Sequence, residues 1–191
     1  MDAEQKRKDA EMDSNVAVFA FSADPITIGH VDILTRAAKL FDKIIVATVP
    51  ETKKSNWLFS YDARQHMIEM LVNEHPILKK NCVASRFAIT NTTVKFCKGN
   101  RANYLIRGIR GYTDLDYEYK LAYLNRQLSD NKLETIFIPG DPNLSMFSST
   151  TVREFMRLNN SYWKKLVPEE ILDYLEQLVK VRHLRGDFDN D

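Results

Sequence analysis

The sequence contains little glycine, proline or cysteine. Its 191 residues include six glycines, six prolines and two cysteines. The glycines form neither the G-x-G-x-x-G pattern of dinucleotide-binding folds nor the G-x-x-x-x-G-K-S/T pattern of P-loop proteins. These absences disfavour a nicotinamide-dependent dehydrogenase and a P-loop kinase.

The sequence also lacks the spacing of a protein-held metal site. Cys82 and Cys97 are far apart in apolar or amphipathic surroundings, so we expect buried or free thiols and no disulfide. The four histidines show no zinc-ligand spacing. We therefore expect no metal-binding residues, and any Mg²⁺ should arrive with the phosphates of a ligand.

Neither sign of charge dominates the chain. Lysine and arginine total 27 against 26 aspartates and glutamates, and the basic pairs are scattered, which argues against a nucleic-acid stripe or a polybasic membrane anchor. No apolar run approaches the roughly 20 residues of a membrane span. Residues 1–14 have mixed charge and no hydrophobic signal-peptide core, so we expect a cytoplasmic protein.

The length predicts one domain with a substantial core. We expect a polar, disordered extension over residues 1–14, a single domain over 15–182, and a polar, acidic tail over 183–191. These boundaries follow from composition alone.

Apolar runs alternate with helical patterns along the predicted domain. Strands are predicted over 16–21, 43–49, 81–87, 104–106 and 133–138, and helices follow them, including one capped by Ser60 and one over 115–128. This alternation predicts an α/β fold, a Rossmann-like parallel sheet of about five strands with helices on both faces. Ligands of such sheets bind beyond the carboxyl ends of the strands, so the polar loops there should converge on one crevice.

A polar turn, Ser22 to His30, joins the first predicted strand to the first helix. Free N–H groups and the helix dipole attract phosphate at such a junction. The Thr27 hydroxyl and the His30 ring are donors that suit the charge growing on a phosphorus atom under attack. Thr27-Ile28-Gly29-His30 resembles the T/H-x-G-H motif of nucleotidyltransferases, which transfer a nucleoside monophosphate from NTP and release pyrophosphate. Alternatively, His30 is an ordinary first-turn residue.

The second half of the chain carries a longer series of motifs. They resemble, in order, the R-G-L-R, D-F-E-Y-E, L-A-x-x-N-R-x-L, E-T-x-F and S-S-S-x-V-R-E motifs of bacterial phosphopantetheine adenylyltransferases, and the likeness covers roughly residues 16–178. The resemblance implies transfer of AMP from ATP to 4′-phosphopantetheine, giving dephospho-coenzyme A and pyrophosphate. It also implies Mg²⁺ carried by the ATP phosphates and a homohexamer. The matching segments are 105–110, 114–119, 121–128, 134–137 and 148–154.

The same resemblance implies roles for individual residues. The expected catalytic residues are His30, Lys53 and Arg110. Those expected to bind ATP are Ser22, His30, Gly108, Arg110, Glu118, Ser148, Ser149 and Thr150. Those expected to bind the acceptor are Ser22, Lys53, Thr93 and Arg107.

Structural roles are open for several of these residues. Arg107 could pair with Asp114 or Asp116, Lys53 could be a solvated loop charge, and Ser149 could be a helix N-cap. Each of these structural roles would account for an arginine, lysine or serine at that position even if the residue bound no ligand.

The chain departs from the family pattern at several positions. Phe21 replaces a glycine, Thr92 and Thr93 replace an apolar pair near the pantetheine arm, and Leu144 replaces an aromatic residue near adenine. Two alternatives therefore stay open: a nucleotidyltransferase for another phosphorylated acceptor, and a catalytically weak relative that binds a nucleotide or coenzyme A.

Overall fold

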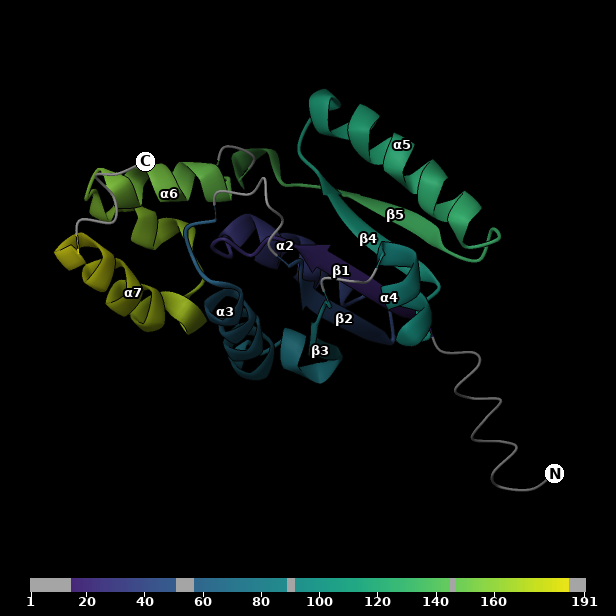
Figure 1. The fold of residues 1–191 in the computed structure, drawn as a ribbon, viewed down its shortest axis with the longest axis horizontal. Helices are drawn as coiled ribbons and strands as arrows, with labels where there is room; N and C mark the ends of the chain where they lie inside the picture. The colour runs from purple at the N-terminus through teal and green to yellow at the C-terminus, as the bar shows by residue number, and fades with distance from the viewer. Residues whose placement is uncertain (1–14, 51–56, 89–91, 145–146, 186–191) are drawn as a thin grey trace, which may run out of the picture.

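A five-stranded parallel sheet forms the centre of the molecule (Figure 1), in the order β3-β2-β1-β4-β5. The computed structural model describes residues 15–50, 57–88, 92–144 and 147–185. The predicted α/β fold with a parallel sheet is confirmed. The strands are β1 (Val16–Phe21), β2 (Lys43–Thr48), β3 (Cys82–Arg86), β4 (Tyr104–Ile109) and β5 (Glu134–Pro139).

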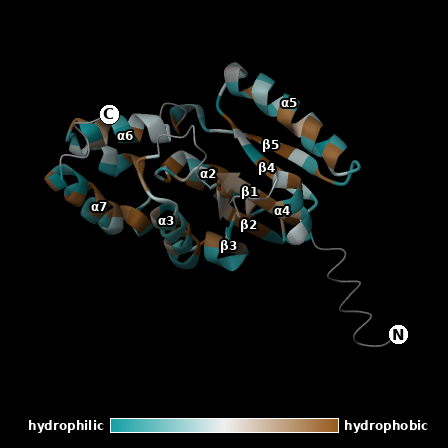
Figure 2. Cartoon of the chain, viewed as in Figure 1, coloured by the Kyte–Doolittle hydropathy of each residue, from teal (hydrophilic) through white to brown (hydrophobic). Residues whose placement is uncertain are grey.

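The inner strands are buried on both faces, which explains their continuous apolar sequences. In β1, every residue before Phe21 is buried, and β2 is buried from Ile44 onward. β1 pairs with β2 from Val16↔Lys43 to Phe21↔Thr48, and with β4 on its other side. Hydrophobic residues dominate these central strands in Figure 2.

Two hydrophobic clusters lie on opposite faces of the sheet. On one face, Phe19 and Val46 pack with residues of α2 (Ile28–Ala37), α3 (Tyr61–Glu74), α6 (Ser149–Arg157) and α7 (Leu172–Arg185). On the other face, Val18 and Ile45 pack with α4 (Thr93–Gly99), and α5 (Tyr112–Leu128) contacts α4, β4 and β5. Helices on both faces were predicted, and the structure confirms them. The short 3₁₀ turns are η1 (Leu78–Lys80), η2 (Pro142–Leu144), η3 (Ser161–Leu166) and η4 (Glu169–Ile171).

The element boundaries differ from the prediction at three places. β4 continues through Ile109, because it pairs with β5 as far as Pro139, so Arg107 and Gly108 are strand residues and not part of a turn. Helix α2 already begins at Ile28, and α7 continues to Arg185, past the expected domain end at residue 182.

The chain reverses direction across the sheet between β1 and β4. From β1 it builds β2 and β3 on one side, and it then returns to add β4 and β5 on the other. The loops leaving β1 and β4 diverge at this point, and they leave a crevice at the carboxyl edge. The site described next lies there.

Candidate active site

Two adjoining pockets lie at the carboxyl ends of β1 and β4. The first, a cavity of about 170 Å³, is lined by Arg107, Gly108 and Glu118 among others, and the second, of about 270 Å³, lies beside the start of α6. His30 and Arg110 line both pockets. An elongated ligand that fills both pockets therefore passes these two side chains. The second pocket also holds Ser22, Ser148, Ser149 and Thr150.

His30 is held by the turn that precedes α2. The main-chain N–H of Thr27 donates to His30 Nδ1 over 3.1 Å, and the Thr27 hydroxyl lies 3.0 Å from the same atom. Because Nδ1 accepts, the proton of the neutral ring is assigned to Nε2. The ring thus presents an N–H donor at its other edge.

Its surroundings keep the His30 ring neutral. Burial, aided by the positive charge of Arg110, lowers the pKa of His30 to about 3. The Phe21 ring lies against the imidazole, with 4.6 Å between centroids and 32° between planes. Phe21, which departs from the family pattern, therefore covers one side of the ring and helps to exclude water from it.

Arg110 is the most accessible cation in the first pocket among its described lining residues. Its side chain is 48% exposed, and its Nε lies 3.8 Å from Asp114 Oδ2. The Arg110 main-chain N–H also donates to that carboxylate over 3.3 Å. An exposed pair at this distance is weak, so phosphate oxygens can replace Asp114 around the guanidinium.

Arg107 is engaged by the protein itself. It donates to Glu118 through two parallel hydrogen bonds of 2.7 and 2.5 Å, and Nη1 donates to the carbonyl of Ala20 over 2.9 Å. The structural pairing considered from the sequence therefore occurs, but with Glu118 in place of Asp114 or Asp116. This fork joins β4 to α5 and to the end of β1, and it forms one wall of the first pocket.

The start of α6 provides donors to the second pocket. Ser148 is the N-cap, because its hydroxyl accepts from the Thr151 N–H over 3.1 Å. The Ser149 hydroxyl donates to the carbonyl of Pro25 over 2.8 Å, so the alternative that made Ser149 the cap is wrong. With its first-turn N–H groups beside the pocket, α6 favours an anion there.

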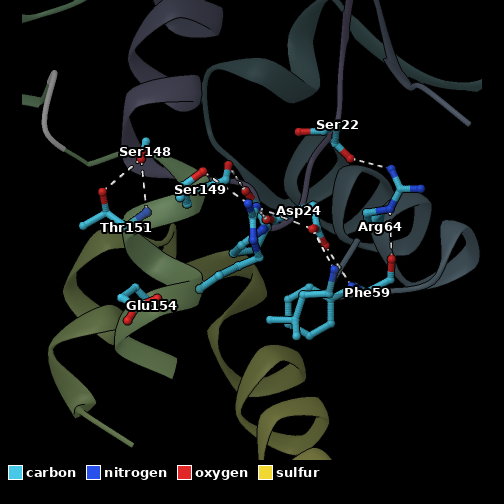
Figure 3. Close-up of polar contacts among 12 residues, drawn as sticks. Ser22, Asp24, Phe59, Arg64, Ser148, Ser149, Thr151 and Glu154 are labelled. Atoms are coloured by element: carbon cyan, nitrogen blue, oxygen red, sulfur yellow. Dashed lines mark hydrogen bonds and ion pairs between the residues drawn. The ribbon is translucent and has the colours of Figure 1, made fainter. Parts of the chain in front are cut away.

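Two charged residues that sequence reasoning did not assign to the site hold this pocket together (Figure 3). Asp24 is fully buried, and its carboxylate accepts from the N–H groups of Leu58 and Phe59, each over 2.8 Å. Arg153 donates to the Asp24 carbonyl over 2.6 Å and lies 3.5 Å from its carboxylate. Arg153 belongs to the S-S-T-T-V-R-E segment, and Asp24 precedes a proline in the polar turn, so motif membership was the available signal.

The remaining expected site residues lie elsewhere. Lys53 falls within 51–56, outside the described residues, and its expected role stays a prediction. Thr93 begins α4 and lines neither pocket, so its expected contact with the acceptor also stays a prediction.

Other features of the described residues bear on metals and membranes. They contain no group of three or more His, Cys, Asp and Glu side chains arranged to hold a metal ion. None of the helices in these ranges combines the length and apolar character needed to span a bilayer. Cys82 and Cys97 are free and buried, and burial raises the pKa of each thiol to about 12.

Two solved structures with similar folds are described as adenylyltransferases. A nicotinic acid mononucleotide adenylyltransferase of Plasmodium falciparum, complexed with NaAD, superimposes with a TM-score of 0.64 at 19% identity, covering 86% of this chain and 95% of that one. A putative nicotinate-nucleotide adenylyltransferase of Vibrio parahaemolyticus gives 0.60 at 13% identity, covering 84% and 97%. At these identities the likeness establishes the fold alone.

Proteins related in sequence identify the family of this chain more narrowly than the solved structures do. A family model described as cytidylyltransferase-like matches residues 19–155. A protein of Clostridium perfringens named phosphopantetheine adenylyltransferase is 36% identical over 90% of this chain and 98% of its own length. One of the same name from Coxiella burnetii is 35% identical over 85% and 96%. The chain therefore belongs to the cytidylyltransferase-like family and, within it, to the phosphopantetheine adenylyltransferases.

Proposed function

We propose that the chain transfers the adenylyl group of ATP to the phosphate of 4′-phosphopantetheine, giving dephospho-coenzyme A and pyrophosphate. The relatives named above support this acceptor and do not favour the two alternatives. The observation that carries the proposal is the position of His30 and Arg110, which line both pockets and so lie where a triphosphate that fills the two would pass.

The reaction needs positioning and charge stabilisation more than acid–base chemistry. An oxygen of the acceptor phosphate bonds to the α-phosphorus, and the bond from that phosphorus to the bridging oxygen of the β-phosphate breaks. Pyrophosphate leaves with the electron pair. The attacking phosphate already carries close to two negative charges near neutral pH, so no protein group has to remove a proton.

His30 suits the role of a neutral donor in this reaction. With Nδ1 accepting from Thr27, its Nε2–H is directed by the fold and costs little reorganisation when charge builds on the α-phosphate oxygens. Arg110 adds a planar fork that can bind two oxygens at once. The first turn of α6 holds the leaving phosphates, and Lys53 supplies a further positive charge.

Mg²⁺ accompanies the nucleotide in this proposal. The described residues lack a metal-holding cluster and offer only separate carboxylates in the first pocket, such as Asp114 and Asp141, which fits an ion that keeps most of its ligands as water and phosphate. When bound, the ion neutralises negative charge on the triphosphate.

We also propose that the chain works as a homohexamer in the cytoplasm. Tyr119, Tyr123, Leu124 and Leu128 of α5 are large side chains exposed to solvent, and a second copy would cover them. The two free cysteines support a reducing compartment. Light scattering coupled to size-exclusion chromatography should give six times the chain mass.

Turnover with different acceptors tests the proposed reaction. The protein is incubated with ATP, Mg²⁺ and 4′-phosphopantetheine, and pyrophosphate and the nucleotide product are followed by chromatography. Stoichiometric pyrophosphate and dephospho-coenzyme A support the proposal. Turnover confined to another phosphorylated acceptor, or ATP binding with no turnover, contradicts it.

A further inference from the structure

Arg64 in the first turn of α3 is fully buried. Burying a cation is costly unless hydrogen bonds replace its water. Arg64 Nη1 donates to the carbonyl of Ser22 over 2.6 Å, and Nε donates to the carbonyl of Phe59 over 3.1 Å (Figure 3). Nη1 also donates to the carbonyl of Val49 over 3.0 Å. One side chain thus connects the turn after β1, the chain after β2 and the residues before α3.

The same guanidinium supports an aromatic ring. Its central carbon lies 4.4 Å from the centroid of the Trp57 ring, within cation–π range. Trp57 and Ser22 both line the second pocket, whereas Arg64 lines neither pocket. Arg64 therefore contacts Ser22 and Trp57, two residues of the pocket wall, without lining the space that a ligand would occupy.

Asp24 ties the same segments together a second time. Its carboxylate accepts from the N–H groups of Leu58 and Phe59. The carbonyl of Phe59 in turn accepts the hydrogen bond from Arg64 Nε. Two buried charged groups of opposite sign thus join the turn at 22–24 to residues 57–59 through both backbone donors and acceptors. A pocket wall tied in this way has little freedom to move.

We propose that Arg64 is a positioning residue of the second pocket, fixing the Ser22 backbone and the Trp57 ring where the phosphates of bound ATP need them. This inference rests on the proposed function. It requires the planar fork of arginine, because a lysine ammonium at the same place cannot reach three carbonyls and stack on an indole.

The test compares Arg64→Lys with Arg86→Lys. Arg86 is an exposed arginine that lies over the Tyr61 ring and pairs with Asp62, so its replacement alters a nearby arginine contact without touching the pockets. Steady-state kcat and KM for ATP are measured at a temperature where circular dichroism shows each variant folded. We expect Arg64→Lys to raise KM for ATP and lower kcat/KM at least tenfold, and Arg86→Lys to stay within twofold of the wild type.

A folded Arg64→Lys variant with wild-type kcat and KM would overturn the inference, even with a lower Tm, since a merely structural residue gives that result. If Arg64→Lys does not fold, Trp57→Leu decides, because it removes the supported ring and leaves the three carbonyl contacts of Arg64. A KM for ATP raised at least threefold in Trp57→Leu supports the inference, and unchanged kinetics overturn it.

Binding separates this inference from the proposed function. The increase in Tm produced by Mg·ATP needs no acceptor, so it can be compared between variants whether or not 4′-phosphopantetheine is turned over. A wild type without turnover contradicts the proposed reaction. Equal ATP-induced shifts in wild type and Arg64→Lys contradict the role of Arg64.

Discussion

The main-chain N–H of Thr27 donates to Nδ1 of His30, so the backbone at the start of α2 sets the proton of a ring that lies where two pockets meet. The tautomer does not depend on a second titrating side chain. A neutral donor placed in this way stabilises developing negative charge without having to gain or lose a proton.

Replacing His30 by alanine should lower kcat about 100-fold or more, the usual scale for losing one donor to a transition-state charge, with a smaller change in ATP affinity. Pyrophosphate release and ATP titration measure the two quantities. His66→Ala, on the exposed face of α3, serves as the control. Unchanged kcat in His30→Ala would remove the residue from the mechanism.

Acid should destabilise the protein partly through His30. Its pKa is about 3 in the folded protein and about 6.5 in the unfolded chain, so between these values the unfolded chain binds the extra proton. The free energy of unfolding therefore falls as pH falls through this window, by up to about 1.4 kcal/mol per pH unit from this group. Urea titrations at pH 7, 5.5 and 4.5 should show that the free energy of unfolding falls less steeply with falling pH in His30→Asn than in the wild type. Equal pH dependence in the two proteins would refute the lowered pKa of His30.

Arg110→Lys should reduce kcat/KM for ATP at least tenfold, because lysine keeps the charge but cannot bind two phosphate oxygens in one plane. Arg110→Gln should also raise the pKa of His30, since the arginine charge contributes to lowering it, while burial keeps the pKa below its ordinary value. NMR titration of the imidazole measures that effect. Kinetics of Arg110→Lys equal to those of the wild type would exclude a bidentate role.

Gly108→Ala should lower the free energy of unfolding by about 1–3 kcal/mol through overpacking. A Cβ at Gly108 would lie 3.3 Å from Ile33 Cγ1, so the Ile33 side chain on α2 would have to give by a few tenths of an ångström. Gly111→Ala is the matched control, because nothing lies within 4 Å of its added Cβ. Denaturant melts compare the two, and the Ile33→Val change should recover part of the Gly108→Ala loss.

Local sequence patterns predicted the inner strands and several helix starts. The β-branched run in β2 and the cap at Ser60 are recognisable because each depends on neighbouring residues alone. The end of β4 was missed, since Arg107 and Gly108 look like turn residues until β5 supplies their partners. The local sequence also does not show which of Ser148 and Ser149 caps α6, because serine is a good N-cap at either position. The hydrogen bond from Ser149 to the distant Pro25 carbonyl leaves Ser148 as the cap.

The site residues of the described part of the chain that belong to recognisable sequence motifs were predicted correctly to lie near one another. His30, Arg110 and the hydroxyls at 148–150 come together as the parallel sheet requires, because each follows the carboxyl end of a strand. The supports of the site were not predictable. Arg64 reaches Ser22 across 42 positions and Arg153 reaches Asp24 across 129, and no spacing rule connects residues so far apart in sequence.

The parallel arrangement of the sheet also places one set of connections in the described part of the chain away from the two pockets. The connections over 38–42, 75–81, 100–103 and 129–133 enter β2, β3, β4 and β5 at their amino ends, opposite the pockets. Engineered insertions, affinity tags and fluorophores introduced in these connections would sit a strand's length away from bound nucleotide. Changes in the length of these connections should therefore disturb nucleotide binding less than equal changes in the loops at the opposite edge.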